Sequence, residues 1–247
     1  RMNTPVTPEL GRNGYADAAI KAAGVKTIVN LADNSEDIAG YEGYASTYYA
    51  GQKVITLGLG VDFQAADFQA GLAEGLRFIA ANEGPYLIHC TEGKDRAGFV
   101  SALLECFMGA TYEEVIADYM VTYYNYYGVE PGTEKYAAIA GSNIIKSLQA
   151  AFGVTDLTTA DLKAEAAEYL KAIGLTDDEI AALAANLSAA PQQSETYVVV
   201  AGDSLWKIAK NLYGKGTMWK VLFEANQDLI KDPNRIYVGQ VLTIPEK

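Results

Sequence analysis

Short apolar runs alternate with helical patterns over the first part of the chain. β-branched and aliphatic residues dominate positions 25–31, 53–59 and 85–90, which are typical of buried strands. Between them, over 15–23 and 65–81, apolar residues recur at three- and four-residue steps, the spacing of amphipathic helices. Strands and helices that alternate in this way predict an α/β fold with a mostly parallel sheet.

After the third strand the pattern becomes helical. Helices are predicted over 97–109 and 111–127, and the second is opened by a capping box in which Thr111 precedes Glu114 by three residues. Two further helices are expected, the second starting at Asp177.

A polar segment divides the chain in two. Residues 188–196 have no apolar period and contain proline, glutamine and serine, the composition of an exposed connector. We therefore expect one domain at 1–187 and a second at 197–247. The second domain shows a strand, a Gly-Asp-Ser turn, two helices and a closing strand, which predicts a small α+β (βααβ) unit.

Composition narrows the chemistry. The 31 acidic against 19 basic residues give a net charge of −12, which opposes general binding to nucleic acid. No apolar run reaches the 18 residues of a membrane span. The two cysteines, Cys90 and Cys106, fit neither a redox pair nor a zinc site, and His89 is the single histidine, so we expect no metal and no cofactor.

One loop has the features of an anion site. Residues 85–99 run from an apolar strand through a polar loop into a helix, and Cys90 and Arg96 bracket five loop residues. Backbone N–H groups of such a loop, beside a helix N-terminus, favour an anion. Cysteine in this setting has a pKa of about 3.5 to 7.5, which predicts a nucleophilic thiolate. Arg96 offers a planar fork for two phosphoryl oxygens, and Lys94 adds a second positive charge.

Residues 89–98, His-Cys-Thr-Glu-Gly-Lys-Asp-Arg-Ala-Gly, resemble the HCxxGKDR signature of bacterial tyrosine and phosphoinositide phosphatases. The likeness extends from about 4–11 through 25–33 to 123–127 and covers most of 1–187. The resemblance implies a cysteine-phosphatase fold, with helices flanking a central sheet, and hydrolysis of a phosphotyrosine protein or another phosphomonoester.

By this resemblance Cys90 would form a phosphocysteine and Arg96 would bind the phosphoryl group. Asp95 is favoured as the general acid, with Asp33 and Asp62 as alternatives. The other residues expected to contact the phosphate are His89, Thr91, Glu92, Gly93, Lys94 and Ala97. Many relatives have serine or threonine after the arginine, so Ala97 predicts either slow hydrolysis of the intermediate or a substitute donor.

Other interpretations stay open at this point. Lys94 keeps phosphoinositide lipids among the candidate substrates, and Ala97 keeps open a catalytically weak phosphate-binding protein of the cell envelope. A rhodanese-like sulfur transferase also uses a cysteine loop, but the Lys-Asp-Arg run fits phosphate better. Cys106 is expected in the core, and tyrosines of 119–127 either line a substrate mouth or belong to the core.

Residues 197–245 resemble a LysM domain. The resemblance implies binding of N-acetylglucosamine-containing glycan, such as peptidoglycan or a chitin-like polymer, and hence a secreted or wall-associated protein. The expected glycan-binding residues are Gly202, Asp203, Ser204, Leu205, Asn226, Asp228 and Ile230. The helical phase of Trp206 and Trp219 favours the core for both side chains.

Overall fold

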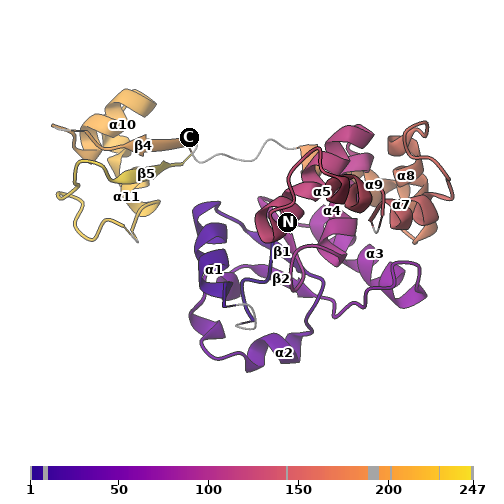
Figure 1. Cartoon of the computed structure of the whole chain (residues 1–247). Coiled ribbons are helices and arrows are strands. Elements are labelled where there is room, and N and C mark those ends of the chain that lie inside the picture. The colour runs from indigo at the N-terminus through magenta and orange to yellow at the C-terminus, as the bar shows by residue number, and fades with distance from the viewer. Residues whose placement is uncertain are drawn as a thin grey trace. The chain divides into compact units, whose positions relative to one another are not determined.

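The computed structural model describes residues 2–7, 11–142, 144–188, 195–200, 202–227 and 229–245. The chain forms two compact units, Arg1–Pro191 and Gln192–Lys247, each with its own buried core (Figure 1).

The first unit is built on a small parallel sheet, which confirms the predicted α/β fold. Its strands β1 (Thr27–Asn30), β2 (Lys53–Thr56) and β3 (Tyr86–His89) lie in the order β2-β1-β3 and pair in parallel. The predicted strands were longer than these paired segments. Some hydrogen bonds nevertheless continue past the ladders, as from the Leu31 N–H to the His89 carbonyl.

Both faces of the sheet are covered. Ile28 and Leu87 belong to one buried cluster with side chains of α1 (Asn13–Ala22) and α2 (Ser35–Gly40). Val29 lies on the opposite face in the main core, so all four residues of the central strand are buried. The short 3₁₀ helices η2 (Tyr44–Ser46) and η3 (Tyr49–Gly51) precede β2.

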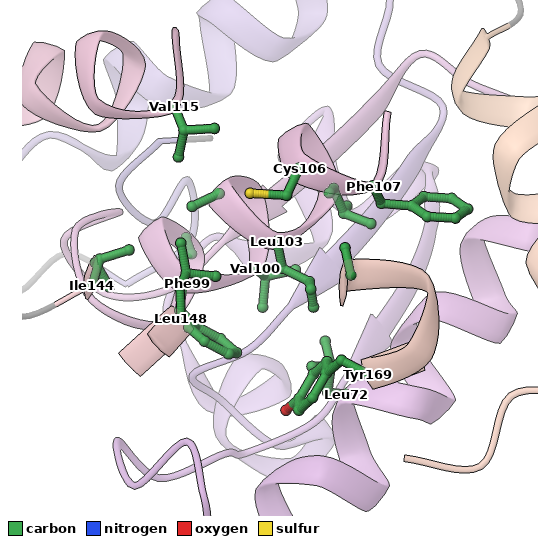
Figure 2. Close-up of a cluster of buried hydrophobic side chains, with 14 of the residues drawn as sticks. Leu72, Phe99, Val100, Leu103, Cys106, Phe107, Val115, Ile144, Leu148 and Tyr169 are labelled. Atoms are coloured by element: carbon green, nitrogen blue, oxygen red, sulfur yellow. The ribbon is translucent and has the colours of Figure 1, made fainter. Parts of the chain in front are cut away.

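The main core surrounds one helix, α4 (Arg96–Phe107). It packs against the helices α5 (Tyr112–Tyr127), α7 (Ile144–Phe152) and α8 (Leu162–Ala172), and its apolar side chains point in several directions (Figure 2). A Cβ atom at Gly98 would lie 3.0 Å from the Tyr119 ring, so glycine permits the close approach of α5. The first turn of α4 therefore packs closely against α5.

The described residues of this unit contain further helices: α3 (Ala66–Ala80), α6 (Glu134–Ala140) and α9 (Asp177–Ser188). The capping box of α5 is present as predicted, and Thr176 caps α9 with Glu179. The prediction of two helices after α5 was wrong, because α6 to α9 make four. The short α6 lies between two glycines, Gly132 and Gly141, and gives too little apolar periodicity to be recognised.

The second unit is a βααβ structure. Strands β4 (Glu195–Val198) and β5 (Val241–Ile244) pair antiparallel, and α10 (Leu205–Tyr213), η4 (Gly216–Met218) and α11 (Trp219–Glu224) connect them. Because β4 begins at residue 195, the last two residues of the predicted connector belong to a strand. Most of the rest of that connector lies outside the described residues.

Candidate active site

The cysteine loop lies where β3 meets α4. Cys90 directly follows β3 and is 2% exposed, and α4 begins at Arg96. Parallel strands bring their carboxyl ends to the same edge of the sheet, so the segments after β1 and β2 approach this loop.

The N-terminal segment packs against the loop. Met2 forms an isolated parallel bridge with His89, and the Thr4 N–H donates to the Thr91 carbonyl at 3.0 Å. Gly93 has a positive φ of 78°, and a Cβ atom there would lie 2.5 Å from the Met2 carbonyl carbon. Glycine is therefore required both by the turn and by the close backbone contact.

The loop presents unpaired donors. Within the described residues, the backbone N–H groups of Glu92, Gly93 and Lys94 donate no hydrogen bond. Arg96 Nη1 donates to the Leu59 carbonyl at 2.8 Å and Nη2 to Thr91 Oγ1 at 3.1 Å. These bonds fix the guanidinium against the loop, while its buried Nε has no partner in the described part of the chain. The arrangement suits an anion that accepts several hydrogen bonds.

Lys94 is paired inside the loop. Its Nζ lies 3.0 Å from Glu92 Oε2 and 3.7 Å from Asp95 Oδ2. Partial burial by itself lowers the pKa of Lys94, but its hydrogen bond to Glu92 and the charges of Asp95 and Glu92 outweigh this effect, and the net shift of the pKa is upward. Lys94 therefore keeps its charge at neutral pH.

His89 connects the loop to Tyr49 through hydrogen bonds. It is fully buried; Nδ1 lies 3.3 Å from the Cys90 carbonyl and Nε2 lies 2.9 Å from the Tyr49 hydroxyl. A carbonyl only accepts, so Nδ1 carries the proton and Nε2 accepts from Tyr49. Burial lowers the pKa of His89 to about 4, which leaves the ring neutral. Asp17 in turn accepts from the Tyr48 and Tyr49 N–H groups. Nothing in the sequence around Tyr49 marked this link.

The three candidate acids differ in their surroundings. Asp95 precedes α4 without using its side chain as a cap, and that side chain is 46% exposed. Both carboxylate oxygens of Asp33 accept hydrogen bonds, from Asn30 and Tyr41. Asp62 accepts from the Gln64 N–H in the turn before α3, where Ala65 rather than Asp62 is the N-cap. Asp95 is thus the only one of the three candidates within the anion loop, and its side chain makes no hydrogen bond to the described part of the chain.

The second cysteine lies elsewhere. Cys106 is ten residues after Arg96 on α4, about 15 Å along the helix axis. Its sulfur lies among apolar side chains, and burial raises its pKa to about 12 (Figure 2). The position after the arginine is a buried alanine, Ala97, which has no hydroxyl to offer the loop.

The tyrosines of α5 divide between core and surface. Tyr119 and Tyr123 are buried, whereas Tyr127 is 47% exposed and its hydroxyl donates to Glu92 Oε2 at 3.4 Å. Beside the loop lies a cavity of about 240 Å³. Its described lining comprises Met2, Asn3, Glu92, Gly93, Asp118, Val121, Thr122, Asn125 and Tyr126.

A second concave site lies in the βααβ unit. This groove of about 400 Å³ is lined by Asp203, Ser204, Leu205, Trp206, Trp219, Pro233, Asn234 and Ile236. Trp206 is 49% exposed, so the expectation that it is a core side chain was wrong; its ring lies over Gly216, where no Cβ could fit. Trp219 is partly buried against the core of the unit.

The remaining predicted glycan residues do not line this groove. Asn226 is buried and its side chain bonds the backbone of Leu222 and Thr243, which ties α11 to β5. Ile230 is 1% exposed in the core. Gly202 is exposed beside the turn, and Asp228 lies outside the described residues. The side chains of Asn226 and Ile230 therefore stabilise the fold.

Among the described residues, no cluster of histidine, cysteine, aspartate and glutamate could hold a metal ion. No helix in that part of the chain is long and apolar enough to cross a bilayer.

Two family models match the chain: that of the tyrosine phosphatase family over residues 61–189, just over half of it, and that of the LysM domain over 197–245. The potassium binding protein Kbp of Escherichia coli O6:H1 is 35% identical over 108 residues, which are 41% of this chain and 69% of Kbp. The resuscitation-promoting factor Rpf of Micrococcus luteus is 45% identical over 53 residues, 22% of this chain and 23% of Rpf. With the cysteine loop between β3 and α4, these matches establish that the chain belongs to the tyrosine phosphatase family and has a LysM domain near its C-terminus.

Proposed function

We propose that the protein is a cysteine-dependent phosphomonoesterase that works through a phosphocysteine intermediate and binds cell-wall glycan through its LysM domain. The observation that supports this most directly is the Arg96 guanidinium, which two hydrogen bonds hold against the loop while its buried Nε–H lacks a partner among the described residues. A phosphoryl oxygen would satisfy that donor.

In the proposed reaction the Cys90 sulfur attacks phosphorus, and the bond from phosphorus to the leaving oxygen breaks. The Arg96 fork and the loop N–H groups stabilise the charge on the equatorial oxygens. Asp95 donates the proton to the leaving oxygen and then accepts one from the water that hydrolyses the phosphocysteine. His89 stays neutral and holds the Cys90 carbonyl, so it transfers no proton.

The two cysteines provide a matched test. Cys90→Ser removes the thiolate and should lower hydrolysis of para-nitrophenyl phosphate by at least about 1,000-fold. Cys106→Ser exchanges the other cysteine in the same way, in a position remote from the loop, and should keep its turnover wherever it folds. Full turnover by Cys90→Ser would overturn the mechanism.

Ala97 favours a second candidate, a phosphate-binding envelope protein that turns over poorly. No hydroxyl follows the arginine in the loop, so release of the phosphoryl group from sulfur could limit the reaction. Single-turnover kinetics separate the candidates: a burst of leaving group without steady release of phosphate supports the second, and steady release supports the first. Ala97→Ser should then raise the steady rate if this step is limiting.

For the second domain we propose a role in attachment to peptidoglycan, with export of the protein. The groove next to the exposed Trp206 supports a glycan site, and the similarity to the LysM family supports the same class of ligand. Binding of soluble peptidoglycan fragments by the full chain tests this directly, and no binding at millimolar fragment would contradict it.

A further inference from the structure

In the loop of the candidate active site, acidic residues of the same loop pair with the positive charge of Lys94. Lys94 lies within reach of two carboxylates, those of Glu92 at 3.0 Å and Asp95 at 3.7 Å. The ammonium group donates one hydrogen bond to Glu92, and the Asp95 carboxylate adds a second negative charge at ion-pair distance. Lys94 is 20% exposed whereas Glu92 is 40% exposed, so the carboxylate is the more accessible half of this pair.

A side chain of α5 holds this arrangement in place. The Tyr127 hydroxyl donates to Glu92 Oε2 at 3.4 Å, and the Tyr127 ring centroid lies 5.7 Å from Lys94 Nζ. The aromatic ring and the two carboxylates together stabilise the charged form of Lys94, whose pKa is raised despite its partial burial. The pair therefore persists at neutral pH.

The cavity beside the loop is lined by Glu92, whereas Lys94 is not among its described lining residues. Asp118 also lines the cavity, so a group that entered it next to a bound phosphate would meet two carboxylates. A neutral or cationic group could lie there. A second phosphate would approach a negative charge, and the lysine that could have bound it is already paired.

We propose that Glu92 is a specificity-determining residue that favours esters with a single phosphate on an uncharged or cationic carrier, such as a phosphotyrosine peptide, over inositol lipids with two phosphates on the ring. This inference rests on the proposed phosphatase function and names its substrate class.

The test compares kcat/KM of the full chain for a phosphotyrosine peptide and for a short-chain phosphatidylinositol bisphosphate, both measured by release of inorganic phosphate. The native protein should prefer the peptide. Glu92→Gln keeps the shape of the side chain but removes its charge, and should shift the ratio toward the bisphosphate by about tenfold, which is about 1.4 kcal/mol. Glu113→Gln, an exposed acid at the opposite end of α5, removes the same charge and should leave the ratio unchanged.

A double variant tests whether Glu92 acts through Lys94. If Glu92 acts by neutralising Lys94, the shift should be largely absent when Glu92→Gln is made together with Lys94→Gln. Tyr127→Phe removes only the hydroxyl that holds Glu92 and should shift the ratio in the same direction by about twofold.

Three outcomes would overturn the inference: a native preference for the bisphosphate, an unchanged ratio in an active Glu92→Gln protein, or an equal shift in Glu113→Gln. Failure of the proposed function would look different, because neither substrate would then be hydrolysed and no variant would alter the result.

Discussion

The two concave sites of this protein are built in different ways. The cysteine loop is one contiguous segment between β3 and α4, and within the described residues three of its backbone N–H groups have no hydrogen-bond partner. The LysM groove is assembled from side chains of separate segments, at 203–206, at Trp219 and at 233–236. The loop thus depends mainly on one short segment, whereas the groove depends on three. We expect single substitutions to damage the loop more severely than the groove.

After Cys90→Ser, the largest effect should follow from Arg96→Lys. Lysine keeps the positive charge but cannot form the fork that donates to Leu59, to Thr91 and to a phosphoryl group. We expect kcat/KM for an aryl phosphate to fall by about 100-fold or more, with glycan binding unchanged. Arg77→Lys is the matched control, because Arg77 pairs with Glu179 on α9, and its kcat/KM should change by less than about twofold. A similar loss in both variants would show that the fork of Arg96 has no special role.

Low pH should destabilise the two domains to different extents. The unfolded chain protonates His89 near its ordinary pKa of 6.5, whereas the folded protein does so only near 4. Between these two pKa values, unfolding therefore takes up a proton. As pH falls through this range, the free energy of unfolding of the phosphatase domain should decrease by up to roughly 3 kcal/mol. Above pH 6.5, His89 should contribute no pH dependence.

Urea unfolding at about pH 7 and about pH 4.5 measures this effect. The phosphatase transition of His89→Gln should lack that part of the pH dependence. The LysM domain contains no histidine, so its transition should not show this component in either protein. Equal pH dependence of the native and His89→Gln phosphatase transitions would contradict a buried neutral His89.

The smallest effect is expected at the groove. Trp206→Ala removes a half-exposed ring from one wall and should weaken binding of a peptidoglycan fragment by about tenfold, without altering phosphatase kinetics. Tyr237→Ala removes an aromatic side chain that is 63% exposed and is not among the described lining residues. Calorimetric titration measures the affinity of both variants for the fragment. An equal loss of affinity in the two variants would place the glycan outside the groove.

The same contrast explains what the sequence could predict. Strand periodicity and the residues 89–98 predicted the parallel sheet and the loop, because the signal for each lies within a few consecutive positions. The support of His89 by Tyr49 could not be predicted, since 40 residues separate them and only the fold brings the hydroxyl to the ring. Trp206 was misassigned for a related reason: its helical phase resembles that of a core residue, but its ring packs only against the turn at Gly216 and stays half-exposed.

The most direct test of the account is to identify the covalent intermediate. The protein is mixed with excess aryl phosphate, quenched in acid within the first turnover and analysed by peptide mass spectrometry. The account predicts one phosphoryl group on Cys90, absent from Cys90→Ser and present in Cys106→Ser. Turnover with no phosphoryl group on Cys90, or with phosphate on another residue, would contradict it.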